Sequence, residues 1–287
     1  MGSRESGIGR AGAGLASDDS RFPIPYSRAV GPQRIVCLTE EPTEVLYALG
    51  EEHRIVGISG FTVRPSRARK EKPKVSAFTS AKIGAILALE PDFAVGFSDI
   101  QADIARDLIR AGVEVWISNH RSVEGILDYI RRLGSLVGAA EKADAYVRSA
   151  QAHIAEVERA AASLPRRPSV YFEEWNDPLI SGIAWVSELI ERAGGDDIFP
   201  ELRAKRSAPE RVVSPEQVLD AKPDIILASW CGKPVKTVAI ASRPGWQDLA
   251  AVRQGRIWEI ASADILQPGW RLIHGYERLK NIIKATA

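Results

Sequence analysis

Two segments of this chain repeat one pattern, and the repeat limits what the chain can fold into. Ile86–Ser98 and Val218–Trp230 each hold a helix end, a Pro-Asp pair and an apolar run typical of a buried strand, and they start 132 residues apart. Between them, Ala139–Ser163 runs for 25 residues without glycine or proline and is rich in strong helix formers. We therefore predict an α/β fold of two lobes, each a parallel-sheet sandwich, joined by one long rigid α-helix with a ligand cleft between the lobes.

The rest of the chain fits this division, because short β-rich runs alternate with helical patterns in both halves. We expect strands at residues 34–38, 54–58, 93–97, 114–118, 169–173, 224–229 and 256–260. We expect helices at residues 43–50, 83–89, 104–111, 123–137, 185–193, 215–221 and 270–284. The predicted units are a disordered tail at 1–30, a first α/β lobe at 31–138, a linking helix at 139–165 and a second α/β lobe at 166–287.

Composition narrows the function classes. Basic and acidic residues number 38 and 37, so no overall field favours a nucleic-acid partner. The two cysteines lie in different halves, and no run of 18 apolar residues exists, so we expect neither a disulfide framework nor insertion into a membrane. The first thirty residues lack the apolar stretch of a secretory signal. We expect a cytoplasmic protein as the sequence stands, or a periplasmic or extracellular one if a signal was removed.

Candidate site residues follow from the predicted sheets. In open parallel sheets, ligands bind beyond the carboxyl ends of the strands, where helix N-termini point at the ligand. This rule selects fifteen positions, five of which carry aromatic or imidazole rings: Thr39, Glu40, Glu41, Phe61, Thr62, Phe97, Ser98, Asn119, His120, Glu173, Glu174, Trp175, Trp230, Cys231 and Asp264. Flat apolar platforms rimmed by carboxylates and hydroxyls suit a large ligand with a planar face.

Several of these residues also have a purely structural interpretation. Glu173 and Glu174 are neighbours on a strand and point to opposite faces, so a catalytic pair would need an immediate turn, and a rim role is favoured. His120 could ligate a metal or only bond to backbone, and Trp175 could belong to the core. Cys231 could bind a metal or a corrin cobalt, although most free cysteines are small buried apolar groups. No two histidines are spaced for a zinc site, so a protein-built metal centre is not expected.

The order of motifs carries a resemblance. Over about residues 32–285, the chain resembles the class III, helical-backbone substrate-binding proteins of ABC importers for cobalamin and ferric siderophores, through RIVCLTEEPTEVLYALG, ILALEPDFAVGFS, a long helix, SVYFEEWNDPLISGIAWVSELIERAGG and VVSPEQVLDAKPDIILASW. The EEW and SWCGKP segments are most similar to cobalamin-binding members. The resemblance implies a non-enzymatic, monomeric binding protein without a catalytic cofactor, whose ligand, cobalamin or a related corrinoid, lies flat between the lobes.

The strand-end rule and the resemblance together select twelve ligand-binding candidates: Glu40, Glu41, Phe61, Phe78, Phe97, His120, Glu174, Trp175, Trp185, Trp230, Cys231 and Asp264. In the cobalamin-binding members, a tyrosine stands at Phe61, an SxW turn stands where this chain has Ser76-Ala77-Phe78, and an acidic residue falls at Asp264. The substitutions keep an apolar face but remove polar groups. The ligand could therefore be a corrinoid variant or another tetrapyrrole-like compound.

One departure from the family concerns its transporter. Members that serve an ABC permease dock through one surface glutamate per lobe; Glu216 stands at the second-lobe position, but Gly84 stands at the first. This suggests a cytosolic corrinoid-binding protein that no longer delivers to a permease, or delivers to another partner. Two alternatives remain. A ferric-siderophore or haem binder would want Arg or Lys at the cleft, where only Lys233 follows a selected strand end. A hydrolase would use Glu173 or Glu174 as acid or base.

Overall fold

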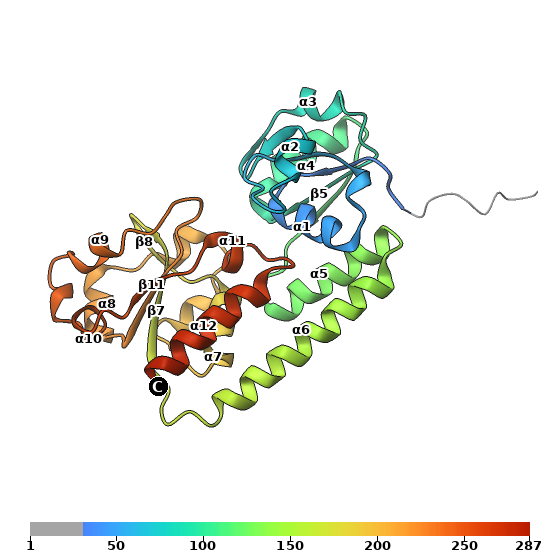
Figure 1. The fold of residues 1–287 in the computed structure, drawn as a ribbon. Helices are drawn as coiled ribbons and strands as arrows, with labels where there is room; N and C mark the ends of the chain where they lie inside the picture. Colours follow the sequence, from blue (N-terminus) through green and yellow to red (C-terminus); the bar gives the residue numbers. More distant parts are fainter. Residues whose placement is uncertain (1–30) are drawn as a thin grey trace, which may run out of the picture.

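The fold is that of a two-lobed α/β protein, as the sequence predicts. A computed structural model describes residues 31–287, and the tail expected at 1–30 lies outside the described residues. Figure 1 shows the two lobes side by side, with the long helices α5, α6 and α12 running along them. None of the described helices combines the length and apolar character that a bilayer crossing requires.

The first lobe is built on a six-stranded sheet with the order β4-β3-β2-β1-β5-β6. All its neighbouring strands are parallel except β3 and β4. Its strands are β1 (Ile35–Cys37), β2 (Ile55–Ser59), β3 (Lys74–Ala77), β4 (Ser80–Ala81), β5 (Phe93–Phe97) and β6 (Glu114–Ser118). Its helices are α1 (Glu40–Leu49), α2 (Ala68–Glu71), α3 (Ile83–Leu87) and α4 (Ala102–Arg110).

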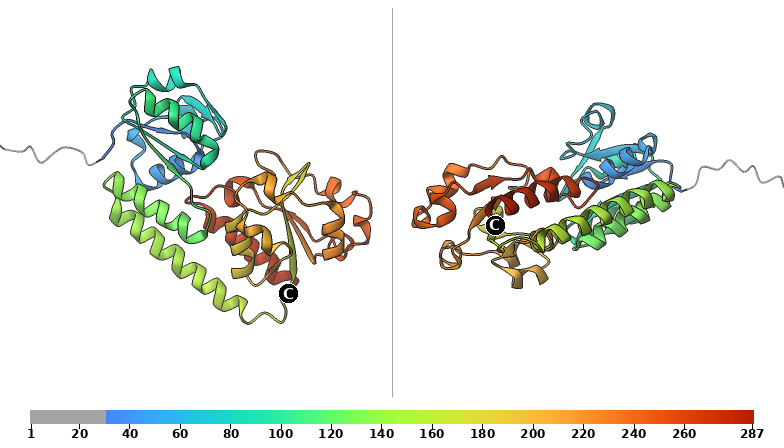
Figure 2. Two further views of the ribbon diagram at one scale, coloured as in Figure 1. Left: turned by 180° about the vertical axis from the view of Figure 1, so that it is seen from behind. Right: turned by 60° about the horizontal axis from the view of Figure 1, so that its bottom comes forward.

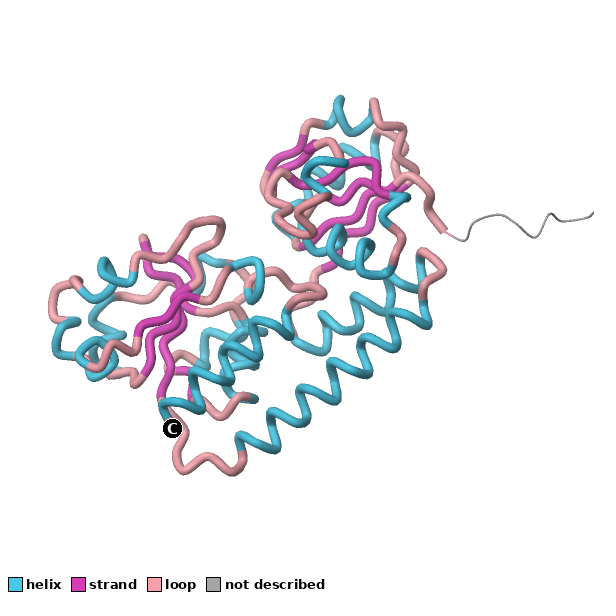
Figure 3. The backbone as a smooth tube through the Cα atoms, in the orientation of Figure 1, coloured by secondary structure: helices cyan, strands magenta, loops and turns pink. Residues whose placement is uncertain are grey.

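The second lobe is built on a sheet with the order β11-β10-β7-β8, to which β9 adds by pairing with β7. Figure 3 shows its strands as a group separate from those of the first lobe. Its strands are β7 (Ser169–Asn176), β8 (Leu179–Ser181), β9 (Asp196–Asp197), β10 (Ile225–Ala228) and β11 (Ile257–Glu259). Its helices are α7 (Ala184–Arg192), α8 (Pro215–Ala221), α9 (Thr237–Ala241), α10 (Ala250–Arg253), α11 (Ser262–Ile265) and α12 (Leu272–Thr286).

Local sequence explains where several of these elements begin and end. Ser214 accepts a hydrogen bond from the Gln217 backbone while the Gln217 side chain accepts one from Ser214, a capping box that starts α8. Gly50 closes α1 with a φ of 82°, a left-handed conformation that favours glycine. Short 3₁₀ turns complete the connections: η1 (Glu52–Arg54), η2 (Asp99–Gln101), η3 (Pro200–Ala204), η4 (Ala208–Arg211) and η5 (Trp246–Asp248).

A long helix connects the lobes, as the sequence predicts. This helix, α6 (Ala140–Ala161), is 22 residues long, and α5 (Val123–Leu136), which we expected only as a crossover helix, runs alongside it (Figures 1 and 2). The two helices approach closely, because a Cβ on Gly134 would lie 2.4 Å from the Cβ of Ala143. Two packed helices therefore join the lobes. A strict alternation of strand and helix predicts α5 as a crossover, and the sequence pattern alone does not show which face it covers.

Candidate ligand-binding site between the lobes

The carboxyl ends of β5 and β6 meet the second lobe directly. The ring centroids of Phe97 and Trp185 lie 6.1 Å apart in an edge-to-face arrangement. The His120 Nε2 lies 3.3 Å from the Pro268 carbonyl oxygen. The backbone N–H of Val123, at the start of α5, donates to the Glu188 carboxylate at 2.9 Å. All six of these residues are buried or partly buried, so the base of the space between the lobes is packed protein.

His120 is held by its neighbours on every side. Its ring lies 4.9 Å from the ring of Phe97 and 5.0 Å from that of Tyr129, and its Nδ1 lies 2.7 Å from the Ser118 hydroxyl. Burial lowers the pKa of His120 to about 4, so the ring is neutral at physiological pH. Both ring nitrogens already have partners. Coordination of a ligand's metal would therefore require loss of the contact to Pro268.

Trp185 and Trp230 are both buried, in different core clusters, and offer no open face to a ligand. The Trp185 indole donates to the Ile265 carbonyl at 2.9 Å, and the Trp230 indole donates to Glu173 at 3.0 Å; both rings are buried. Phe97 is buried as well, and Phe78 packs against the main core. The strand-end rule places residues near a site, but it does not distinguish a ring that faces the ligand from one that supports the site.

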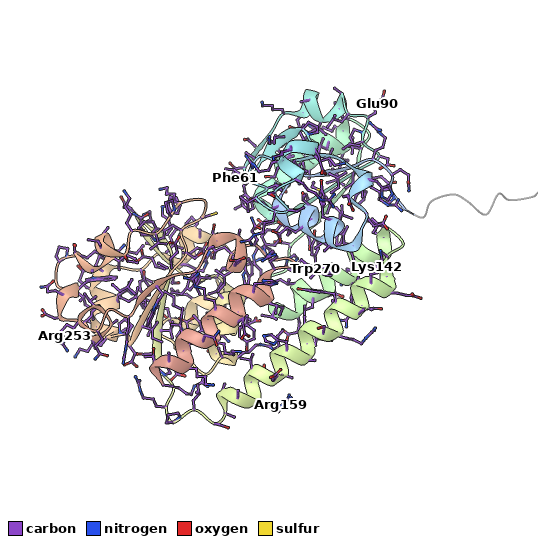
Figure 4. The ribbon with its side chains drawn as sticks, in the orientation of Figure 1. Phe61, Glu90, Lys142, Arg159, Arg253 and Trp270 are labelled. Carbon is purple, nitrogen blue, oxygen red and sulfur yellow. The ribbon has the colours of Figure 1, made fainter. Side chains whose placement is uncertain are left out.

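Phe61 and Trp175 present aromatic surface to the solvent. Phe61, after β2, is 51% exposed, and Figure 4 shows it at the edge of the first lobe that faces the second lobe. Trp175, at the end of β7, is partly exposed; its indole donates to the Asp177 carbonyl at 2.9 Å, and the Lys233 ammonium lies 3.8 Å from its ring centroid. A planar ligand could therefore reach these two rings from the solvent.

Glu173 and Glu174 point to opposite sides of the strand, as their adjacency predicts. Glu173 is fully buried and accepts two hydrogen bonds from Arg243, at 2.5 and 2.9 Å. Glu174 accepts two from the buried Arg211, at 2.6 and 3.0 Å. Each carboxylate is bound to its own guanidinium on a different face. Neither is free to act as acid or base on a substrate held between them.

Carboxylates at the start of α1 face the second lobe. Burial raises the pKa of Glu41 to about 8, and the charge of Glu40 adds to that rise, although the Thr39 hydroxyl donates to Glu41 at 2.6 Å. Burial also raises the pKa of Glu40. A Cβ on Gly269 would lie only 2.8 Å from the Cβ of Glu41, which shows how closely the second lobe approaches α1. These groups are protonated more readily than ordinary glutamates.

Charged residues of both lobes affect the pKa of the Cys231 thiol. The Cys231 side chain is exposed, yet partial loss of solvent around the thiol raises its pKa, and the charges of Glu40 from the first lobe and Glu174 from the second lobe raise it further. The strand ends of the two lobes are therefore within electrostatic range of each other at this point. A thiol that resists ionisation is a poor ligand for a metal, because the thiolate is the ligating form. Among the described residues, no cluster of His, Cys, Asp and Glu side chains could hold a metal ion.

A group of arginines was missed by the strand-end rule. The Arg121 guanidinium lies 4.9 Å from the ring centroid of Phe97 and donates to Asp99 at 3.0 Å. Burial lowers the pKa of Arg121, and the charges of Arg206 and Arg211 lower it further. Arg121 belongs to the first lobe and the other two to the second. A sequence signal existed for Arg121, which follows His120, but Arg206 and Arg211 come from the loop and turn before α8.

The remaining predicted residues lie at the edges of this region. Asp264 in α11 forms an ion pair across the lobes with Arg64, which also donates to the Ala263 carbonyl at 3.3 Å. Glu216 is exposed in the first turn of α8, and a hydrogen bond from Ser214 lowers its pKa. Gly84 is exposed in α3, with open space where a Cβ would stand. Glu216 and Gly84 thus both lie on the surface.

Comparison with known proteins gives the class of this chain. Residues 35–263 match the family described as periplasmic binding protein, so the chain belongs to that family of substrate-binding proteins, which are not enzymes. A vitamin B12-binding protein of Vibrio campbellii is 28% identical over 88% of this chain and 91% of its own length. An ABC transporter substrate-binding lipoprotein of Bacillus subtilis is 26% identical over 88% of this chain and 80% of its own length.

Solved structures share the fold. A periplasmic haem-binding protein from Roseiflexus superposes with a TM-score of 0.77 at 24% identity, over 89% of this chain and 99% of the other. The periplasmic vitamin B12-binding protein of Vibrio cholerae superposes with a TM-score of 0.72 at 24% identity, over 89% and 98%. The expected architecture of two lobes on a helical backbone is therefore confirmed.

Proposed function

We propose that this chain binds cobalamin or a related corrinoid between its lobes, as a substrate-binding protein of the ABC-transporter type. The observation that carries the proposal is the contact between the lobes at the carboxyl ends of β5 and β6, where the rings of Phe97 and Trp185 lie 6.1 Å apart and His120 Nε2 lies 3.3 Å from the Pro268 carbonyl oxygen. The accessible rings of Phe61 and Trp175 supply apolar surface for a planar macrocycle. Relatives that carry the name vitamin B12-binding protein support the choice of ligand.

The visible spectrum of cobalamin tests this proposal. Cyanocobalamin and aquocobalamin should both bind, with their cobalt bands unshifted, because both ring nitrogens of His120 are engaged and the Cys231 thiol stays protonated. Phe61→Ala should weaken binding by about tenfold through lost apolar contact. Val238→Ala is the matched control, since Val238 is an apolar residue of α9 that is 76% exposed and is not one of the twelve ligand-binding candidates. Saturation by haemin with no binding of either corrinoid would overturn the proposal.

A second candidate is an anionic chelate such as haem or a ferric siderophore. It is favoured by Arg121 and by Arg206 of the second lobe, whose charge acts on Arg121 across the lobes; both guanidinium groups would attract ligand carboxylates, whereas Arg211 is already bound to Glu174. Arg121→Gln separates the two candidates. It should reduce affinity for haemin and leave cyanocobalamin, whose periphery is amidated, unaffected. An equal loss of affinity for both ligands would show that Arg121 stabilises the packing of the lobes and does not pair with a charge on the ligand.

For the partner, we propose that docking to an ABC permease is weak because one of two charges is missing. Glu216 presents a carboxylate on the second lobe, whereas Gly84 presents none on the first. Gly84 has room for a side chain, so Gly84→Glu adds the charge without a clash. The Gly84→Glu variant should bind a corrinoid permease with higher affinity than the wild type does. The wild type should behave as a monomer. Tight docking of the wild type that Glu216→Ala abolishes would contradict this proposal.

A further inference from the structure

A pocket of about 370 Å³ lies at the junction of the lobes, beside α1. Three sets of residues line it: Glu44, Tyr47 and Ala48 of α1, Arg64, Pro65 and Arg67 of the loop after β2, and Trp270 and Arg271 just before and at the start of α12. Figure 4 shows Trp270 at this junction. None of the twelve ligand-binding candidates lines the pocket, and its volume is in the range of small-molecule sites.

The aromatic walls of this pocket are fixed in place. Trp270 stacks on Tyr146 of α6, with ring centroids 3.6 Å apart and planes 17° from parallel, and the Tyr146 hydroxyl donates to the Trp270 carbonyl. The Tyr47 hydroxyl donates to Glu71 at 2.7 Å, and the Arg67 guanidinium lies 4.8 Å from the Tyr47 ring centroid. A ligand that packs against these rings would lose little free energy in ordering them.

Two of the arginines in the pocket are already paired. Arg64 forms its ion pair with Asp264. Arg67 donates to Glu52 at 2.7 Å and lies 3.8 Å from Glu71. The protein thus supplies the counter-charges for both. These ion pairs hold the loop after β2 against the η1 turn and against α11.

Two polar groups of the pocket lack hydrogen bonds. Glu44 is only 6% exposed, and its Oε1 has no hydrogen-bond partner. The Nε of Arg271 is also buried without one; the nearest carboxylate oxygen, on Asp264, lies 3.8 Å away, while another nitrogen of Arg271 lies 3.1 Å from His274 Nδ1. Unpaired buried donors and acceptors are rare in proteins, and each calls for an explanation. In this pocket, the acceptor Glu44 Oε1 and the donor Arg271 Nε both lack a hydrogen-bond partner.

The charged side chains that line the pocket determine which charges a ligand must carry. An anion alone would pair with Arg271 but would be repelled by ionised Glu44, and a cation alone would meet three guanidinium groups. A molecule that carries both charges leaves neither side unpaired. Burial raises the pKa of Glu44 to about 7, against the opposing effect of Arg64 and Arg271, and an adjacent ammonium group would favour the ionised carboxylate.

We propose that this pocket is a second binding site, which takes a small zwitterion of the amino-acid type. The ligand carboxylate pairs with Arg271, its ammonium group donates to Glu44, and its apolar part packs between Tyr47 and Trp270. Because residues of both lobes line the pocket, the ligand would bridge the lobes. The inference does not depend on the identity of the ligand at the strand ends.

Three probes of matched size test this proposal on the full chain without corrinoid. L-phenylalanine carries both charges, 3-phenylpropionate lacks the ammonium group and 2-phenylethylamine lacks the carboxylate. Isothermal titration should show L-phenylalanine binding at least about tenfold more tightly than either analogue, because each charged hydrogen bond is worth about that factor. Equal affinity for all three, or no binding of L-phenylalanine at millimolar concentration, would overturn the proposal.

Substitutions locate the binding. Arg271→Gln and Glu44→Gln should each weaken L-phenylalanine by about tenfold, and Glu44→Gln should bring its affinity close to that of 3-phenylpropionate. Arg278→Gln is the control, since Arg278 lies on the same helix but lines a different surface pocket. Thermal unfolding would verify that each variant is folded. Unchanged affinity in folded Arg271→Gln would refute the site, whereas cyanocobalamin binding, measured separately, would remain a test of the proposed function alone.

Discussion

The acidic residues at the start of α1 are unusual because three of them lie within five positions and all are largely buried. Burial raises the pKa values of Glu41 and Glu44 to about 8 and about 7, and the neighbouring Glu40 contributes to both. A helix N-terminus stabilises negative charge, but here the loss of solvent outweighs that effect. The carboxyl groups of Glu41 and Glu44, at the junction between α1 and the second lobe, therefore stay protonated to a higher pH than ordinary glutamates do.

This gives a pH dependence with a defined sign. Glu41 has a higher pKa in the folded state than its usual 4.5, so its contribution to stability is complete below pH 4.5 and is lost as the pH rises through about 8. Glu41→Gln should come close to the wild type in unfolding free energy at pH 4 and exceed it by about 2 to 4 kcal/mol at pH 8. Urea unfolding at the two pH values measures this. The same difference at both values would contradict the assignment.

Glu173 gives a second prediction at the scale of single residues. It is fully buried, and Arg243 and Trp230 are its partners. Removing one member of a buried ion pair leaves the other unpaired, so Glu173→Ala should lower the unfolding free energy by about 3 kcal/mol. The double variant Glu173→Leu, Arg243→Met should recover most of that loss. Failure of the double variant to recover stability would show that the ion pair is not the main contribution of Glu173.

At the scale of elements, the sequence predicts the buried central strands well. β1, β5, β7 and β10 are short apolar runs, and hydrophobic pattern alone locates them. The edge strand β8 was missed, because its three residues pair with β7 through a tight connection and carry no periodic signal. The pocket at the junction was missed for another reason. Its lining residues come from segments some two hundred positions apart, and only the fold brings them together.

The connection between the lobes depends on the close packing of α5 against α6. A side chain at Gly134 would drive against Ala143, since even a Cβ would lie 2.4 Å from the Ala143 Cβ. Gly134→Leu should therefore lower the unfolding free energy by about 3 kcal/mol, as overpacking does at its more severe end. Gly84→Ala is the control on α3. It meets open space and should change stability by less than about 1 kcal/mol.

At the scale of the whole molecule, the lobes are tied together by more than one connection. One buried cluster extends from Ile35 in β1 to Ile283 in α12 and includes residues of α5, α6 and α7. Arg192 of α7 forms ion pairs with Glu124 of α5 and Glu158 of α6. A continuous core of this kind has one packed arrangement, because interiors are close-packed. Wide opening and closing would require that core to separate.

We therefore predict that ligand binding moves the lobes very little. Spin labels at Gly84→Cys in α3 and Val238→Cys in α9 would report the distance between the two lobes. The background carries Cys231→Ser, because Cys231 is exposed and would also be labelled, whereas Cys37 is buried. Saturating cyanocobalamin should shift the mean distance by less than about 3 Å, as expected where partners are preorganised rather than closed by a hinge. In contrast, Tyr146→Ala removes the ring that stacks on Trp270 and should broaden the distribution. A shift of about 10 Å on binding would show that the helices α5 and α6 bend, and the shared core would then be a feature of one state only.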